Sequence, residues 1–275
     1  MKYAIQLQYN DERFEYALAC AKNAGFKYIA VGFGSSDCFN CDTWENNIIK
    51  LDKLIKSKGL ECIQTHLPTH NLLLSAELTD GNKDTEILRG IEAGAMLGAE
   101  WNVYHARSAI NDNYSPRKSM EYEKTSIGRF VEKANACKSG LVIENIPVFP
   151  DVPKWRFFTS DYEDLCELHD YFKSDYTSVC WDFGHANLMG NNDEKALSCV
   201  GDRIKCTHIH DNDGNFDHHY LPFQGKIEWE KVMPALKKTG YNGALTLELD
   251  YKRVPCLESF FRHSLDCLEY LDELV

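Results

Sequence analysis

The stretch Ile204–Gly225, IKCTHIHDNDGNFDHHYLPFQG, joins a short apolar run to a dense group of histidines and carboxylates. Its first residues, Ile204–Thr207, are typical of a buried strand. The polar group that follows consists of His208, His210, Asp211, Asp213, Asp217, His218 and His219. Imidazole nitrogen and carboxylate oxygen are usual ligands of zinc, manganese and iron. The stretch therefore predicts either a polar surface loop or part of a divalent-metal site, and the rest of the chain decides between the two.

Short apolar runs alternate with longer amphipathic runs along the whole chain. The expected strands are Ala4–Leu7, Tyr28–Val31, Cys62–Thr65, Trp101–Tyr104, Leu141–Ile143, Val179–Trp181, Ile204–Thr207 and Ala244–Leu247. The expected helices follow at 11–24, 44–55, 85–97, 127–137, 162–172, 193–200, 229–238 and from 257 onward. In the second of these helices, Trp44, Ile48, Leu51 and Ile55 recur at the spacing of one helical face.

Eight strand–helix units predict a parallel sheet that closes into a (β/α)8 TIM barrel. The chain of 275 residues suits a single domain spanning 1–275, because such barrels have roughly 250 residues. A doubly wound open sheet is the alternative architecture. The glycine fingerprint GxGxxG is absent after the first strand, which disfavours a dinucleotide-binding site.

Composition narrows the function classes. The formal net charge of -12 disfavours a nucleic-acid partner, because an acidic surface repels a phosphate backbone. No stretch approaches the roughly 20 apolar residues that a membrane helix needs, and the start, MKYAIQLQYNDERF, lacks the apolar segment of a secretory signal. With eleven cysteines, this predicts reduced thiols and a cytoplasmic location. Cys38 and Cys41 form a single CxxC, which we interpret as incidental loop cysteines rather than a thiol site.

The residues that end the expected strands carry the functional signal. They are His66, His105, Glu144, Asp182 followed by His185, His208 and Glu248 on strands three to eight, with Asp217 and His219 added by the loop after strand seven. In TIM barrels the chemistry lies at the carboxyl ends of the strands, so these groups are expected at one mouth. One such residue alone is usually hydrogen-bonded or solvated. Six consecutive strands ending this way predict a site, and a divalent cation would relieve the repulsion between its carboxylates.

Five segments resemble the xylose-isomerase-like barrel superfamily. They are LVIENIP (141–147), CWDFGHANLMG (180–190), THIHDN (207–212), DHHYLPFQGKIEW (217–229) and LELD (247–250). That superfamily contains metal-dependent sugar isomerases, ketose 3-epimerases, inosose dehydratases and endonuclease IV. Its sugar epimerases hold one divalent ion with Glu, Asp, His and Glu at the ends of strands five to eight. The resemblance therefore implies Glu144, Asp182, His208 and Glu248 as metal ligands and His185 as a substrate-binding residue.

The resemblance implies a sugar or sugar-phosphate isomerase or epimerase that depends on zinc, manganese, cobalt, iron or magnesium, and it leaves open whether the protein is a homo-oligomer. The cation would stabilise an enediolate, while Glu144 and Glu248 move the proton as an acid/base pair. His66 and His105 would line the opposite wall or help to bind a phosphate. Arg107, just past the fourth strand, is the candidate for binding an anionic substituent.

Endonuclease IV provides an alternative within the same superfamily, a multi-zinc phosphodiesterase acting on abasic DNA. It holds three zinc ions, and His66, His105, Asp217 and His219 fall at places corresponding to its additional ligands. Its histidine–proline–glycine after strand four is His-Ala-Arg here, and its asparagine–aspartate–serine is His-Asp-Asn at 210–212. A non-catalytic sugar-binding barrel that keeps the metal is a third possibility. The arginine that some epimerases carry six residues past the metal histidine is Gly214 here, so no particular ketose is predicted.

Overall fold

A ring of parallel strands forms the frame of the fold, which we describe from a computed structural model for residues 1–34, 36–69, 73–74, 81–109, 115–148, 157–172 and 174–275. The strands of the ring are β1 (Lys2–Gln8), β2 (Tyr28–Gly32), β3 (Glu61–His66), β5 (Trp101–Tyr104), β7 (Gly140–Glu144), β8 (Thr177–Asp182), β9 (Ile204–His208) and β10 (Ala244–Leu247). They are hydrogen-bonded in the order β10-β1-β2-β3-β5-β7-β8-β9, and every pair is parallel. Each expected strand is present.

The ring closes between β9 and β10 just past the end of β9. Ile209 forms a parallel bridge with Leu247. Its amide donates to the Thr246 carbonyl (2.8 Å), and its carbonyl accepts from the Glu248 amide (3.1 Å). The predicted (β/α)8 barrel is therefore confirmed, and the alternative of an open doubly wound sheet is excluded.

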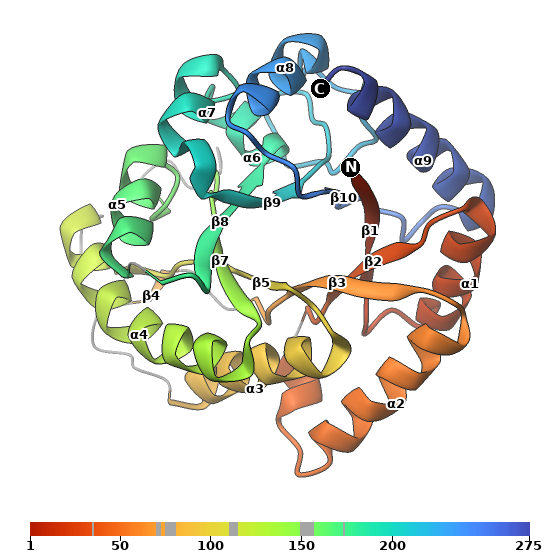
Figure 1. Cartoon of the computed structure of the whole chain (residues 1–275), viewed down its shortest axis with the longest axis horizontal. Helices are drawn as coiled ribbons and strands as arrows, with labels where there is room; N and C mark the ends of the chain where they lie inside the picture. The colour runs from red at the N-terminus through yellow and green to blue at the C-terminus, as the bar shows by residue number, and fades with distance from the viewer. Residues whose placement is uncertain (35, 70–72, 75–80, 110–114, 149–156, 173) are drawn as a thin grey trace.

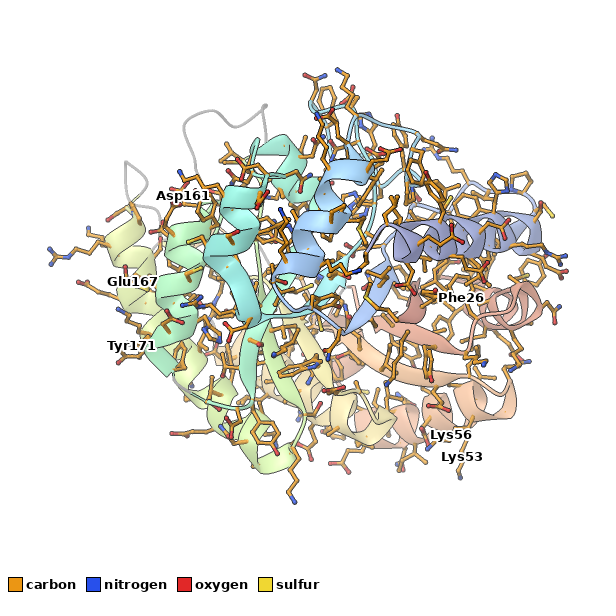
Figure 2. All side chains as sticks on the ribbon, turned by 45° about the horizontal axis from the view of Figure 1, so that its top comes forward. Phe26, Lys53, Lys56, Asp161, Glu167 and Tyr171 are labelled. Atoms are coloured by element: carbon orange, nitrogen blue, oxygen red, sulfur yellow. The ribbon has the colours of Figure 1, made fainter. Side chains whose placement is uncertain are left out.

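Helices surround the strands, as Figure 1 shows. They are α1 (Phe14–Ala24), α2 (Trp44–Ser57), α3 (Gly81–Leu97), α4 (Pro116–Cys137), α5 (Tyr162–Phe172), α7 (Glu194–Val200), α8 (Trp229–Lys238) and α9 (Leu257–Glu273). Each buries one apolar stripe; in α2 the stripe is Trp44, Ile48, Leu51 and Ile55. The opposite face of α2 carries Lys53 and Lys56, which point outward in Figure 2. None of the helices in the described ranges is long and apolar enough to cross a membrane.

Some elements differ from expectation. Helix α4 begins at Pro116 rather than near 127. Ser115 caps this start, because its hydroxyl accepts a hydrogen bond from the Lys118 amide (3.3 Å). Helix α6 (Phe183–Leu188) was not predicted, because six residues do not reveal a helical period. The short elements β4 (Leu73–Leu74), β6 (Ser108–Ala109), η1 (Ser36–Phe39) and η2 (Gly201–Arg203) were also missed.

Side chains fill the interior of the barrel below its mouth. Val103, Val142, Cys180 and Cys206 form a small buried cluster inside the ring, with Trp101 packed against it. Among the described residues, no cysteine is joined to another in a disulfide. The polar strand ends above this layer are therefore separated from the opposite end of the barrel by a packed floor.

Candidate metal centre and substrate pocket

Four strand ends bring Glu144, Asp182, His208 and Glu248 together at the mouth. Each offers one ligand atom, and these atoms all lie within 4.8 Å of one another. They come from β7, β8, β9 and the residue after β10, which are consecutive around the ring. Glu144, Asp182 and His208 are fully buried. Three carboxylates and one imidazole at this separation, without a buried arginine or lysine among them, fit the donor set of a divalent transition-metal ion.

His208 lies at the centre of this group and turns Nδ1 towards the carboxylates. This atom is 2.9 Å from Glu144 Oε1, 3.2 Å from Glu248 Oε2 and 3.7 Å from Asp182 Oδ2. The other ring nitrogen, Nε2, lies 2.8 Å from Gln64 Nε2. Because one nitrogen faces the carboxylates and the other is held by a side-chain amide, the imidazole orientation is fixed from behind.

Two buried glutamines and an asparagine support the group. The Gln64 carbonyl oxygen accepts from the Thr246 hydroxyl (3.2 Å). Gln6 Nε2 donates to Glu248 Oε1 (2.5 Å). Asn145 pairs with the backbone of Asp182 in both directions, accepting from its amide (2.7 Å) and donating to its carbonyl (2.9 Å). Sequence reasoning missed all three, because glutamine and asparagine are uncommon ligands of transition metals and their positions, inside β1 and β3 and just after β7, carry no signal of their own.

A second group consists of His66, His105 and Glu144, whose candidate ligand atoms also lie within 4.8 Å of one another. His105 Nε2 is 2.7 Å from Glu144 Oε2 and 3.0 Å from His66 Nε2. His66 Nδ1 is 2.9 Å from the Leu67 carbonyl, which leaves Nε2 to face the mouth. Glu144 thus contacts His208 with one oxygen and His105 with the other.

A third group contains His185, His210, Asp217 and His219. Asp217 Oδ2 is 3.2 Å from both His185 Nε2 and His219 Nε2. Backbone carbonyls hold the other nitrogens: Nδ1 of His185 is 2.9 Å from the Asn145 carbonyl, and Nδ1 of His219 is 2.8 Å from that of Glu248.

His210 belongs to this group, although from the sequence it was named only among the polar residues after Thr207 and received no individual role. It is fully buried, and its Nε2 lies 3.0 Å from Asp182 Oδ2. Its ring stacks on that of His219 at 4.0 Å between centroids. A Cβ on Gly184 would lie 1.9 Å from the His210 ring, so only glycine leaves room for it. The available signal was its place two residues after His208, which in an extended segment puts both side chains on the same side.

The charges of the three groups depend on one another. Burial acts to raise the pKa of the Glu144 carboxyl, but the charges of His208 and His105 outweigh it and hold this pKa well below its usual value. Burial acts to lower the pKa of His219, but Asp217 and Glu248 raise it to about 9. A nearby positive charge therefore stabilises the carboxylates, and protonated histidines or a bound cation can supply it.

Members of all three groups face one cavity of about 290 Å³. Its walls include His66, His105, His185, Asp217, His219, Glu248, Gln6 and Gln8, together with Thr69, Ile146 and Pro147. The cavity lies where chemistry is expected in this fold, at the carboxyl ends of the strands. Every metal-ligand or substrate residue expected from the sequence lies in one of the three groups, with the exception of Arg107. Their roles as ligands, acid/base groups or substrate contacts stay predictions.

Arg107 lies elsewhere, and its expected position at the mouth was wrong. Its guanidinium is buried between α3 and α4, where Nη1 is 2.9 Å from Asp84 Oδ1 and Nε is 3.3 Å from Glu123 Oε1. It also packs over the rings of Tyr122 and Phe130. Carboxylates brought close by tertiary packing have neutralised this cation, so it is not available to an anionic substituent.

Comparisons with known proteins agree with this geometry. The family model described as xylose isomerase-like TIM barrel matches residues 18–271. The chain is 40% identical over 250 residues to a fructoselysine 3-epimerase of Escherichia coli O157:H7, covering 86% of this chain and 85% of that protein. It is also 37% identical over 177 residues to the uncharacterised protein y4fM of Sinorhizobium fredii, covering 64% of this chain and 56% of that protein. The matches to y4fM and to two uncharacterised Methanocaldococcus jannaschii proteins span about half of their lengths.

Solved structures share the fold. The crystal structure of a D-tagatose 3-epimerase-like protein has a TM-score of 0.75 at 22% identity and covers 99% of both chains. An IolI protein with a bound zinc atom has a TM-score of 0.77 at 15% identity, covering 98% of both chains. These likenesses concern the fold, whereas the family model and the epimerase relative extend over most of the sequence. The chain belongs to the xylose isomerase-like TIM barrel family.

Proposed function

We propose that this protein is a metal-dependent sugar isomerase or epimerase that moves a proton at the carbon next to a carbonyl. One observation carries the proposal: the carboxylates of Glu144 and Glu248 reach the same His208 nitrogen, at 2.9 Å and 3.2 Å, from strands on different sides of it. Two carboxylates in these positions can accept a proton from a small molecule, or donate one to it, from two directions. The similarity to a fructoselysine 3-epimerase over most of both chains supports the same class of reaction.

The donor set favours a divalent cation held by Glu144, Asp182, His208 and Glu248. When bound, such a cation supplies Lewis-acid polarisation of the substrate carbonyl and stabilises the negative charge that follows proton removal. A zinc atom in the IolI structure supports metal binding in this fold. The identity of the cation stays open among zinc, manganese, cobalt, iron and magnesium.

The side chains of the pocket transfer the proton and position the substrate. Glu144 or Glu248 takes the proton from the substrate carbon, and the partner carboxylate returns one to the same carbon on the other face or to its neighbour. Gln6 holds Glu248 through one oxygen and so fixes the direction of the other. His185, positioned by the Asn145 carbonyl and Asp217, presents Nε2 for a substrate hydroxyl.

The cavity favours an uncharged sugar at this place. None of the described residues that line it is an arginine or a lysine, and Arg107 is paired elsewhere. Among the described side chains of the cavity, a phosphate would therefore face Asp217 and Glu248, with histidines as the only cationic groups. We propose a ketose or a ketose derivative rather than a sugar phosphate as the group that enters the pocket.

Exchange of a carbon-bound substrate proton with heavy water tests the proposal. The metal-loaded protein should exchange a proton of a ketose, measured by proton NMR, and Glu144→Gln or Glu248→Gln should abolish the exchange. Glu228→Gln is the matched control, because Glu228 is exposed outside the pocket and its loss should change nothing. Exchange that persists in either pocket variant would contradict the acid/base assignment.

A second function is favoured by the three adjoining ligand groups, since Glu144 belongs to two of them and His210 of the third contacts Asp182 of the first. Such an arrangement could hold several ions in a phosphodiesterase that cuts abasic DNA. The net charge of -12 opposes a DNA partner. Metal analysis separates the two: one ion per chain favours the isomerase, and three ions with nicking of abasic DNA favour the phosphodiesterase. One ion without proton exchange on any sugar would indicate a non-catalytic sugar-binding barrel.

A further inference from the structure

A second cavity, of about 300 Å³, adjoins the substrate pocket. The two cavities share Gln8, Asp217, His219 and Glu248 as wall residues. The second cavity has its own wall in His218 and the segment 249–252, which follows β10. Strand β1, which ends at Gln8, pairs with β10, and the two are neighbours in Figure 1. A molecule seated against Glu248 can therefore extend into the second cavity.

The segment that forms this wall is firmly anchored. The Arg13 guanidinium donates to the carbonyls of Tyr251 (2.9 Å) and Lys252 (2.7 Å). The Tyr251 side chain is buried, and its hydroxyl accepts from the Gln8 amide (2.9 Å). The Asp250 amide donates to the His219 carbonyl (3.2 Å), which ties the wall to the loop after β9. These contacts give the wall a fixed backbone from which its side chains project.

Two opposite charges on this wall do not neutralise each other. Asp250 and Lys252 are exposed, and both line the second cavity. Asp250 Oδ1 accepts from the Lys252 backbone amide (3.1 Å), which orients the carboxylate. Within the described ranges, the Lys252 ammonium forms no ion pair with Asp250 or with any other carboxylate. The cavity thus presents an anchored anion and a cation, two residues apart, to whatever enters it.

We propose that the second cavity is a subsite for a substituent that carries both an ammonium and a carboxylate group, so that the substrate is a ketose joined to an amino acid. This rests on the proposed function, because the ketose part must occupy the neighbouring pocket. Lys252 pairs with the carboxylate of the substituent and Asp250 with its ammonium. An unsubstituted ketose leaves both charges unused.

A phosphate substituent fits this cavity less well. Asp217, Glu248 and Asp250 all line it, and Lys252 is its one lysine or arginine among the described lining residues. A dianion would gain one ammonium and meet Asp250 next to it, whereas a zwitterion finds a partner for each of its charges. The charge pattern therefore selects an amino acid over a phosphate.

The test uses three compounds that share one sugar: fructose, fructose carrying a butylamino group at C1, and fructose joined at C1 to the ε-amino group of lysine. The second lacks the α-ammonium and carboxylate of the third. Proton exchange in heavy water gives kcat and KM for the metal-loaded protein. KM should be lowest for the lysine compound. Lys252→Met and Asp250→Asn should each raise that KM about fivefold, as expected for a partly exposed ion pair. KM for the other two compounds should stay unchanged.

A binding measurement keeps the subsite testable apart from catalysis. In calorimetric titrations of the lysine compound, Lys252→Met should weaken binding by the same factor. Lys53→Met, on the outer face of α2 in Figure 2, should bind like the unaltered protein. Equal KM for all three compounds, or variants that leave binding of the lysine compound unchanged, would overturn the subsite and leave the proposed function standing. Binding that depends on Lys252 without any proton exchange would overturn the proposed function and leave the subsite standing. No binding of the lysine compound would overturn the subsite.

Discussion

Nε2 of His208 lies 2.8 Å from the side-chain amide of Gln64, on the opposite side of the ring from the three carboxylates. Gln64 is 2% exposed and reaches this position from inside β3. The amide therefore sets the orientation of an imidazole that is expected to bind the metal. A positioning residue of this kind acts on the ligand without touching the ion.

Replacement of Gln64 tests this relationship. Gln64→Leu removes the amide and keeps the approximate volume, so we expect metal affinity to fall about 10- to 100-fold. Thr246→Val is the control, because the Thr246 hydroxyl contacts Gln64 but not His208. Its effect should be much smaller. Calorimetric titration with Mn²⁺ or Zn²⁺ measures both. A folded Gln64→Leu protein with unchanged affinity would show that the amide does not position the ring.

The packing of Gly184 against His210 leads to a prediction about stability. In Gly184→Ala the new Cβ would lie 1.9 Å from the His210 ring, so the buried imidazole must move away from Asp182. We expect the free energy of unfolding to fall by about 1–3 kcal/mol, with a loss of proton exchange. Gly128→Ala in α4 is the matched control, because no atom lies within 4 Å of the added carbon. Urea denaturation distinguishes the two, and equal stability of both variants would contradict the close packing.

Features whose signal lies within a few neighbouring residues could be predicted from the sequence, whereas contacts between distant residues could not. Strands such as Val179–Trp181 and helices such as 162–172 were predicted because their hydrophobic periods lie within a few residues. The order of strands in a barrel then brought Glu144, Asp182, His208 and Glu248 to one mouth without further information. His210 was named in a polar group but received no individual role, because its environment depends on Gly184, which approaches from another part of the chain. Gln6 and Gln64 were missed because their partners lie 242 and 144 residues away.

Metal binding should release protons. In the metal-free protein Asp217 and Glu248 raise the pKa of His219 to about 9, so His219 carries a proton at pH 7. A divalent cation near Glu248 disfavours this charge and expels the proton. Metal affinity should therefore fall as pH decreases below 9, by about tenfold per pH unit for each proton released. Calorimetry at pH 7 in two buffers with different ionisation enthalpies counts the protons. A value of zero would contradict the electrostatic account.

Replacement of Asp217 tests whether this residue belongs to the substrate pocket or binds a metal ion. It contacts His185 and His219 at 3.2 Å each, yet it is not part of the group that contains His208. If one ion is bound by the proposed four ligands, Asp217→Asn should keep one ion per chain and lower kcat/KM by releasing His185. Mass spectrometry under native conditions counts the ions, and proton exchange gives kcat/KM. A loss of one ion in this variant would instead assign Asp217 to a further metal site.

Arg107 provides a test that separates stability from substrate binding. Its guanidinium is 3% exposed and contacts Asp84 and Glu123. Asp84 also pairs with Arg129, so removing Arg107 leaves the buried Glu123 carboxylate without a cation. We expect Arg107→Met to lower the free energy of unfolding by about 3–5 kcal/mol. Because the side chain lies between α3 and α4, away from the substrate cavity, KM of the folded variant should equal that of the unaltered protein. Adding Glu123→Gln should recover part of the stability, since the unpaired charge is then removed. The opposite pattern, unchanged stability with a raised KM, would place Arg107 at the substrate after all.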